Sequence, residues 1–313
     1  MATLAAPQDF VSTLAESALE RAVIEALLYG DIFDYPLTVE ELVRYVPVRC
    51  GSAAELGGVL RRLALEGRVE RRGVYVTLPA RHGLVERRRA RFTESARLWP
   101  QAVRYADVIA RLPFVRMVAV SGALAVDNVE RGADIDYFIV TVPGRLWLCR
   151  ALVVGVVRWA ARREIALCPN YLLSERALTL GDRNLFTAHE VAQLVPLAGA
   201  PIYQRLRRAN DWVDGYLPNA QGAPPQHAGR IRPRSGGPGA RLVERLMAAV
   251  TPAVVERWEM TRKIRKFRAL WGEESDETAF DPDRCKGHFG GNAARVLGEY
   301  AARHELLLGG GAP

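Results

Sequence analysis

Residues 120–140 read VSGALAVDNVERGADIDYFIV, and this stretch decides the fold of the middle of the chain. Apolar, largely β-branched residues flank the pair Asp134 and Asp136, which predicts a β-strand. Because successive strand side chains point to opposite faces, we expect both carboxylates on one face and Ile135 in the core. The apolar run upstream predicts a second strand, and Gly122 predicts a tight turn into a short helix.

Two carboxylates on one strand face offer the hard oxygen ligands that Mg²⁺ or Mn²⁺ prefers. The turn at Ser121 and Gly122 can bring backbone N–H groups close to phosphate oxygens, and the Ser121 hydroxyl can donate as well. The segment therefore predicts a site for a metal-bound triphosphate, with Asp134 and Asp136 as the metal ligands. In the alternative interpretation, the two acids form the solvent face of a half-buried strand and Gly122 closes an ordinary hairpin.

The same segment resembles the signature of the DNA polymerase beta-like nucleotidyltransferase superfamily, in which a Gly-Ser or Gly-Gly turn opens a helix and an Asp-x-Asp strand follows. Gly122 takes the glycine position, Ala125 takes the small residue three positions further on, and Asp134 and Asp136 take the carboxylate pair. The resemblance implies a mixed-sheet α/β core and metal-dependent transfer of a nucleotidyl group from a nucleoside triphosphate. Pyrophosphate would be the leaving group.

The turn and the strand depart from the family pattern at three positions. Ala123 stands where a serine usually follows the glycine, so we expect it to contact a nucleotide through its backbone alone. Asp127 replaces a second glycine, and Ala133 replaces a serine before the first carboxylate. Each change removes a group that would contact phosphate.

The family commonly supplies a third carboxylate from a later strand, and the corresponding stretch here is IALCPNYLLS, residues 165–174. Its polar candidate is Asn170, whose carbonyl can bind a metal or a nucleotide but cannot act as a base. The acceptor hydroxyl would then be activated by the metal or by another carboxylate, such as Glu164 or Asp182. A nucleotide-binding protein with altered catalysis is therefore an alternative.

Two further groups of residues have both a functional and a structural interpretation. Lys286 and His288 lie beside several glycines, which suits a phosphate clamp on the nucleotide but also a loop with solvated charges that leads into a helix. Thr187 and Glu190 have the spacing of a capping box at a helix start. Next to them, His189 is expected to be structural, with the cleft as the alternative.

Three helices and a two-stranded hairpin are predicted over residues 1–80. Capping boxes at Thr38–Glu41 and Ser52–Glu55 open the second and third helices, and Gly67 suits the end of the third. This order resembles the winged-helix family, which implies contact with nucleic acid or with protein. The third helix offers Ala and Gly on its outward face, so protein contact is the preferred interpretation. The candidate nucleic-acid contacts are Arg61, Arg62, Arg71 and Arg72.

Composition divides the rest of the chain into four segments. Residues 81–113 predict a basic helical connector, and residues 114–220 predict the nucleotidyltransferase core. Residues 221–240 are rich in Pro, Gly and Arg, which predicts an exposed linker. Residues 241–313 predict a helical extension that packs on the core or lies on an anionic membrane surface. Packing is the more common outcome, and its core residues would be Trp258, Phe267 and Trp271.

The whole chain has 313 residues, a net charge of +8 and 49% hydrophobic residues, enough apolar material for extensive cores. The excess of arginine indicates either an anionic partner or a high-GC coding bias. Four cysteines without metal-binding or paired spacing argue against a disulfide framework and a zinc finger. We find no transmembrane segment and no signal peptide, which predicts a cytoplasmic protein.

The sequence thus predicts an α+β protein with an N-terminal winged helix, a nucleotidyltransferase mixed-sheet α/β core and a helical C-terminal extension. The predicted reaction moves a nucleotidyl group from a nucleoside triphosphate to an unknown acceptor hydroxyl, with Mg²⁺ or Mn²⁺ as cofactor. Two alternatives stay open. One is a DNA-binding regulator whose altered domain senses a nucleotide, and the other is a scaffold with no ligand.

Overall fold

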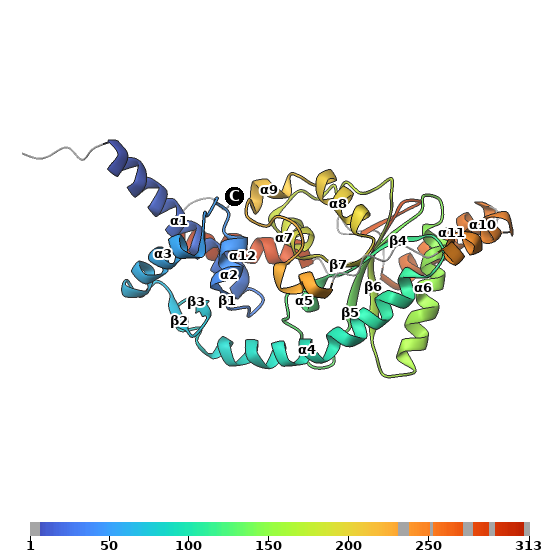
Figure 1. The fold of residues 1–313 in the computed structure, drawn as a ribbon, viewed down its shortest axis with the longest axis horizontal. Coiled ribbons are helices and arrows are strands. Elements are labelled where there is room, and N and C mark those ends of the chain that lie inside the picture. Colours follow the sequence, from blue (N-terminus) through green and yellow to red (C-terminus); the bar gives the residue numbers. More distant parts are fainter. Residues whose placement is uncertain (1–6, 231–237, 251–252, 272–277, 288–291, 310–313) are drawn as a thin grey trace, which may run out of the picture. The chain divides into compact units, whose positions relative to one another are not determined.

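The computed structural model describes residues 7–230, 238–250, 253–271, 278–287 and 292–309, which fold into two compact units (Figure 1). The first unit comprises Met1–Ala90, Trp212–Gln221 and Ala294–Pro313, and the second comprises Arg91–Asp211 and Gly222–Ala293. Both combine helices with β-sheet, so the predicted mixed α+β composition is confirmed. Each unit draws on segments that lie far apart in the sequence.

The first unit contains a small antiparallel sheet in the order β1-β3-β2, which is accompanied by helices. Its strands are β1 (Leu37–Thr38), β2 (Glu70–Arg72) and β3 (Tyr75–Thr77). Its helices are α1 (Pro7–Asp31), α2 (Val39–Tyr45), α3 (Ala53–Leu65), α9 (Val213–Tyr216) and α12 (Asn292–Leu308).

Local capping explains where α2 and α3 begin. Thr38 and Glu41 form the expected reciprocal capping box, since each side chain binds the other residue's backbone N–H. At α3 only half of the capping box is present. The Ser52 hydroxyl accepts from the Glu55 N–H, whereas the Glu55 carboxylate accepts from the N–H of Gly51 rather than that of Ser52. The helix then buries a continuous apolar face, made of Leu56, Val59, Leu60 and Leu63.

The C-terminal helix α12 belongs to the first unit, so residues 241–313 are not one extension of the core. It buries Val296, Tyr300 and His304. The His304 Nε2 atom lies 3.1 Å from a carboxylate oxygen of Glu25, and the Tyr300 ring packs edge-on against Tyr29 with centroids 6.1 Å apart. These contacts join the last described helix to α1.

The second unit is built on a six-stranded sheet in the order β7-β4-β5-β6-β9-β8. Strands β5 and β6 are parallel and are connected by α6, whereas all other neighbours are antiparallel. The strands are β4 (Val115–Val120), β5 (Ile135–Thr141), β6 (Leu167–Ser174), β7 (Val195–Ala198), β8 (Thr278–Asp281) and β9 (Arg284–Gly287). The helices are α4 (Gly83–Ala110, shared with the first unit), α5 (Gly122–Ala125), α6 (Leu146–Ala161), α7 (Leu185–Gln193), α8 (Ala200–Ala209), α10 (Pro238–Val250) and α11 (Ala253–Trp271).

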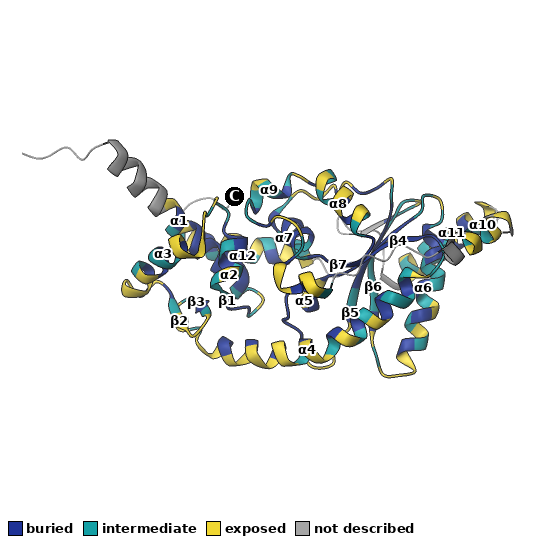
Figure 2. Cartoon of the chain, viewed as in Figure 1, coloured by how far each residue is buried: buried dark blue, intermediate teal, exposed yellow. Residues whose placement is uncertain are grey.

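The two faces of β5 have different roles. Ile135, Tyr137 and Ile139 enter a buried core together with residues of α4 and α6, which confirms the prediction that Ile135 points inward. Figure 2 shows the central strands β4 and β5 as largely buried. The alternate residues Asp136 and Phe138 lie on the opposite face, and the sheet thereby presents the acidic pair away from its main core.

The predicted helical C-terminal extension does contain α10, α11 and α12, but the prediction missed β8 and β9, which extend the sheet by two strands. The linker prediction also needs correction: residues 225–230 form a short 3-10 helix, and His227 in it is buried with its ring nitrogen 3.1 Å from the Ala125 carbonyl oxygen. Residues 231–237 of that linker lie outside the described residues.

Helix α11 contacts α6, as expected for a packed amphipathic segment, but not all of its aromatic residues are buried. Phe267 packs against the core at 5.1 Å from the Phe280 ring, whereas the expectation for Trp258 is wrong, since it is 63% exposed. The side chain of Trp271 lies outside the description. Among the described residues, no helix combines the length and the apolar character needed to cross a bilayer.

The basic connector at residues 81–113 is only partly a solvated helix face. Arg88 is buried in the first unit and donates to Glu41 at 2.9 Å. Arg91 is buried in the second unit and donates to Glu130. Burial of these two guanidinium groups is tolerated because each is paired with a carboxylate. Part of the arginine excess therefore stabilises the fold.

Candidate functional site

Three neighbouring strands place polar side chains in one row across the sheet of the second unit. The Ser121 N–H, just past the end of β4, donates to the Asp136 carbonyl oxygen at 3.0 Å. On the other side, Asp136 pairs in register with Cys168 of β6. Residues paired across adjacent strands project from the same face. Ser121, Asp136 and Cys168 therefore share the face opposite the main core.

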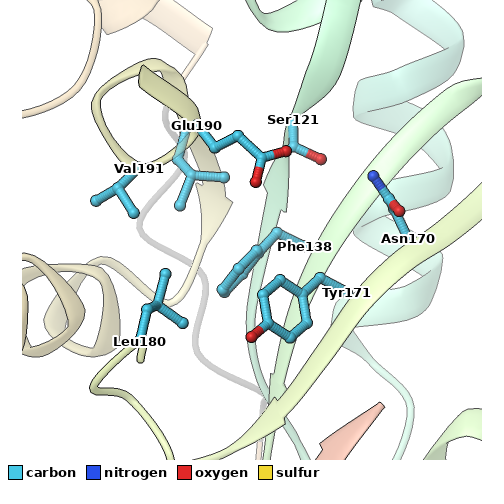
Figure 3. A pocket seen from close by; sticks show the side chains of 8 residues that line it. Ser121, Phe138, Asn170, Tyr171, Leu180, Glu190 and Val191 are labelled. Atoms are coloured by element: carbon cyan, nitrogen blue, oxygen red, sulfur yellow. The ribbon is translucent and has the colours of Figure 1, made fainter. Parts of the chain in front are cut away.

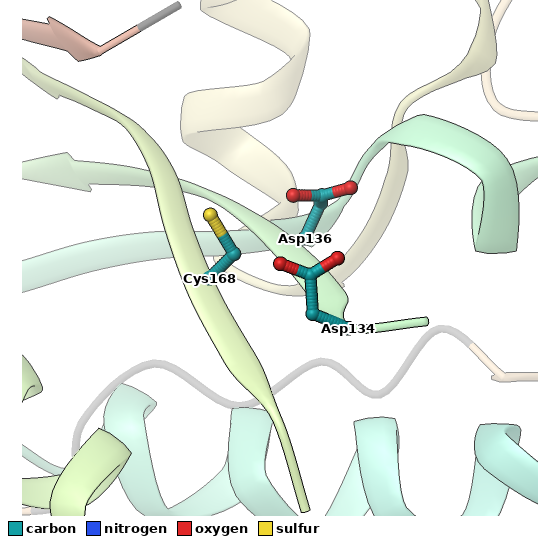
Figure 4. Close-up of side chains that lie close together, drawn as sticks. All are labelled: Asp134, Asp136 and Cys168. Atoms are coloured by element: carbon teal, nitrogen blue, oxygen red, sulfur yellow. The ribbon is translucent and has the colours of Figure 1, made fainter. Parts of the chain in front are cut away.

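Asp134 joins this row from the residue just before β5. One oxygen from each of Asp134 and Asp136 and the Sγ of Cys168 all lie within 4.8 Å of one another. Figure 4 shows these three side chains rising from two neighbouring strands. Asp134 is exposed, whereas Asp136 and Cys168 are partly buried. The arrangement can hold a cation with one side open to solvent, which leaves room for a substrate.

Gly122 lies directly against the Asp136 carboxylate. Its backbone has φ +64°, and a Cβ atom built there would lie 2.5 Å from the Asp136 Oδ2. Any side chain would thus meet both backbone strain and a steric clash. The Asp136 carboxylate therefore faces the glycine turn.

The turn is held by the loop that follows it. Asp127, in the position of the family's second glycine, also has positive φ (52°), a conformation that Asp tolerates better than most residues. Its carboxylate accepts from the Trp99 indole at 2.6 Å. Helix α5 has only four residues, so its dipole adds little at the turn. Gly122 and Ala123 are nevertheless exposed, so their backbone is accessible to a ligand.

The electrostatics of the pair favour binding of a cation. Burial, followed by repulsion from Asp134, raises the pKa of Asp136 to about 7, while a hydrogen bond with Cys168 opposes the rise and Glu190 adds to it. For Cys168, burial and the same two carboxylates raise the pKa of the thiol. Because an opposite charge would relieve the repulsion, the pair fits a cation better than solvent alone.

A small pocket lies beside the acidic pair on the same side of the sheet (Figure 3). The rings of Phe138 and Tyr171 form one wall, with centroids 5.0 Å apart and planes tilted by 68°. Ser121 and Asn170 contribute polar groups, and Glu190 reaches in from α7. The remaining lining residues are apolar: Leu180, Val191 and Leu194.

A β-bulge turns Asn170 toward this pocket. The register shifts from Asp136↔Cys168 to Phe138↔Tyr171, so β6 has one residue more than β5 between the two pairs. Such an extra residue breaks the simple alternation of faces. Pro169 falls within the bulge, where its missing N–H costs no ladder hydrogen bond.

The prediction of a capping box at Thr187 and Glu190 is wrong. Helix α7 begins earlier, and the Asn184 side chain caps it by accepting from the Thr187 N–H at 2.9 Å. Glu190 therefore lies well inside the helix, where it lines the pocket. His189, on the next position, is buried, and burial lowers its pKa to about 3, which makes it a neutral structural residue. An Asn at the true cap was the only sequence signal that distinguished the two helix starts.

Lys286 lies near the aromatic wall rather than at the glycine turn. It pairs with Tyr171 across β6 and β9, and its ammonium lies 5.8 Å from the Tyr171 ring centroid. The Nζ donates to Asp182 at 2.6 Å, so two charges that the sequence offered as site groups neutralise each other. The neighbouring His288 lies outside the described residues.

The candidate nucleic-acid contacts lie in the first unit and differ in their surroundings. Arg62 is partly buried and donates to Glu20 at 3.0 Å. Arg61, Arg71 and Arg72 are exposed, the first on α3 and the other two on β2. The structure thus leaves three of the four guanidiniums accessible to a polyanion.

Comparisons with known proteins give no assignment, since no family model, no curated protein and no solved structure matches the chain.

Proposed function

We propose that this protein is a metal-dependent nucleotidyltransferase of the DNA polymerase beta type, which moves a nucleotidyl group from a nucleoside triphosphate to an acceptor hydroxyl. One observation carries the proposal: the carboxylates of Asp134 and Asp136 lie close together, and the Gly122 turn packs directly against that of Asp136. Triphosphate chemistry requires a divalent cation and close backbone approach at one place, and this geometry supplies a place for both.

The residues present fit a divalent cation. Two carboxylate oxygens offer hard ligands at short mutual distance, and the repulsion between them is relieved by positive charge. Asp134 and Asp136 would hold Mg²⁺ or Mn²⁺. When bound, the cation neutralises charge on the phosphates and lowers the pKa of a coordinated hydroxyl.

The surrounding groups of the chain have distinct roles in this proposal. The exposed backbone of Gly122 and Ala123 binds phosphate oxygens, and the Ser121 hydroxyl donates to the same group. The apolar pocket beside them holds an uncharged part of a substrate against the Phe138 and Tyr171 rings. Glu190 is an acid of this pocket and can accept the proton of an acceptor hydroxyl, which Asn170 cannot.

The test is incubation of the full chain with each labelled nucleoside triphosphate and Mg²⁺ or Mn²⁺, following pyrophosphate release and label transfer to the protein or to a cell extract. We expect Asp134→Asn and Asp136→Asn each to lower transfer at least about 100-fold, because the cation contributes several kcal/mol to the transition state. The matched control is Glu86→Gln, an exposed acid on α4 that is given no role in the site and should keep full activity. Triphosphate binding without transfer in any combination would instead support a nucleotide sensor.

We propose in addition that α1, α2, α3 and the β1–β3 sheet form a winged helix. The order of three helices followed by a hairpin supports this, with β1 pairing on the outer side of β3. The outward residues of α3 include Ala54, Gly57 and Gly58, which cannot read base edges. Duplex binding by Arg61, Arg71 and Arg72 would then be salt-dependent but indifferent to sequence. A strong preference for one duplex sequence in a competition assay would contradict this.

A further inference from the structure

Cys168 occupies the place in the acidic site where a third ligand would stand. It pairs directly with Asp136 across β5 and β6, and its sulfur lies within 4.8 Å of a carboxylate oxygen of each aspartate. The same three atoms can therefore point at one cation.

We infer that Cys168 is a sulfur ligand of the metal site, and that the site binds cations with affinity for thiolate, such as Co²⁺ and Zn²⁺, more tightly than Mg²⁺. A set of two carboxylates and one thiolate is a mixed hard and soft donor set, which disfavours Mg²⁺ and suits borderline transition metals. This inference rests only on the metal-binding part of the proposed function and is independent of nucleotidyl transfer.

A second observation points to a ligand at the same place. Ser121 is the other neighbour of Asp136 in the row across the sheet, and it is 8% exposed. Its hydroxyl oxygen is buried and has no hydrogen-bond partner among the described residues. A buried hydroxyl without a partner costs about 1–3 kcal/mol. An oxygen of a metal-bound water or substrate in the site would supply that partner.

The local sequence explains why the Cys168 sulfur lies beside the two aspartates while the Asn170 amide does not. Cys168 is the last residue of β6 that pairs with β5 before the register shifts, and the bulge at Pro169 follows at once. Because the bulge turns Asn170 into the neighbouring pocket, the amide is directed to the pocket and the thiol to the two acids. Asn170, the third ligand considered from the sequence, is thereby replaced by Cys168.

Binding is a simple exchange at sulfur. The S–H bond of Cys168 breaks, a bond from sulfur to the cation forms, and the proton leaves to solvent, with no change in oxidation state. In the metal-bound site, the sulfur and one oxygen of each carboxylate would all bond to the cation. A coordinated thiol is held as thiolate even where burial otherwise opposes its ionisation.

The experiment is a titration of the full chain with Co²⁺, followed by the near-ultraviolet absorption that marks a sulfur-to-cobalt bond. We expect this band in the wild type, its loss in Cys168→Ser, and its retention in the control Cys50→Ser, a partly exposed cysteine of the first unit. In the wild type, Mg²⁺ should displace half of the bound Co²⁺ only at a concentration at least tenfold higher than that of Co²⁺. In Cys168→Asp, which offers oxygen in place of sulfur, that preference should fall at least tenfold.

Co²⁺ binding without the sulfur band in the folded wild type, or a band that persists in Cys168→Ser, would overturn the inference. The inference would also be overturned if the wild type and Cys168→Asp preferred Co²⁺ over Mg²⁺ by the same factor. Thermal unfolding of each variant shows whether it is folded, and Cys168→Asp provides a second test if Cys168→Ser is not. A sulfur band without any nucleotidyl transfer would remove the proposed function alone, whereas transfer without the band would remove this inference alone.

Discussion

Gly122 is the residue on which the shape of the candidate site depends most directly. Its backbone has positive φ, and the space where a Cβ would stand is taken by the Asp136 carboxylate. Gly144 has a similar backbone, with φ +70°, but no atom lies within 4 Å of its Cβ position. Comparing the same substitution at the two glycines therefore distinguishes the effect of backbone strain from the effect of contact with the carboxylate.

We predict that Gly122→Ala and Gly144→Ala both lose about 1 kcal/mol to backbone strain. Gly122→Ala should lose about 1–2 kcal/mol more, because the new methyl group displaces a partly buried carboxylate. It should also weaken metal binding at least tenfold, while Gly144→Ala leaves it unchanged. Urea unfolding and a metal titration measure the two effects. Equal behaviour of the two variants would show that the close approach to Asp136 has no consequence.

The raised pKa of Asp136 predicts that its carboxylate lowers the stability of the metal-free protein at neutral and alkaline pH. Its pKa rises from an unfolded value of 3.8 to about 7 in the folded chain. The folded state thus binds more protons than the unfolded state between these values, and stability falls as the pH rises through this window. Each pKa unit corresponds to about 1.4 kcal/mol, so the upper bound is a few kcal/mol.

We therefore predict that Asp136→Asn, with a chelator present, unfolds at a higher temperature than the wild type at pH 8, and that the gain shrinks toward pH 4. Saturating metal should reverse the order at pH 8, because the cation binds and stabilises only the wild type. Thermal unfolding across pH measures both effects. A wild type that is as stable as Asp136→Asn in chelator at pH 8 would contradict the inferred electrostatic cost.

At the scale of elements, α7 decides which acid faces the pocket. Its start at Asn184 rather than near Thr187 places Glu190 in the middle of the helix, beside the Phe138 and Tyr171 rings. The cap is one hydrogen bond from the Thr187 N–H to the Asn184 side chain. The position of a candidate proton acceptor thus depends on the first turn of this helix.

We predict that Asn184→Ala destabilises the protein by about 1 kcal/mol and raises amide exchange in the first turn of α7. Thr187→Val, which keeps the backbone N–H and the side-chain volume, should leave exchange in that turn unchanged. Hydrogen exchange of the two variants distinguishes the two caps. Greater exchange in Thr187→Val than in Asn184→Ala would return the cap to Thr187.

At the scale of the whole molecule, the chain crosses between its two units several times. The first unit is completed by residues 212–221 and by α12, which packs Tyr300 against Tyr29 and His304 against Glu25. Folding of the N-terminal unit therefore requires the end of the chain. Neither unit is a continuous segment that could be excised by sequence alone.

We predict that Tyr300→Ala destabilises the first unit by about 3 kcal/mol, because Tyr300 is 4% exposed and its ring fills a buried contact. Amide protection should fall in α1 and α3 but not in β4–β6. The control is Leu306→Ala on the same helix, where the side chain is 84% exposed and little should change. Equal loss of protection in both units would show that they unfold as one.

The sequence by itself determined features that depend on short-range geometry. The strand at residues 135–141, the inward side chain of Ile135 and the capping box at Thr38 follow from alternation and local hydrogen bonding. The same alternation places Asp134 and Asp136 on one face. The approach of the Gly122 turn to Asp136 depends in addition on the pairing of β4 with β5.

Only the tertiary structure decided which distant residues complete the site and the units. Cys168 reaches the acids through strand register and a bulge, Glu190 through the start of a helix, and Lys286 through a late hairpin at residues 278–287. None of these contacts leaves a periodic pattern in the chain, because pairing across a sheet is set by long-range packing rather than by local spacing. The sequence predicts the acidic pair, whereas only the pairing of β6 with β5 shows that Cys168 lies beside it.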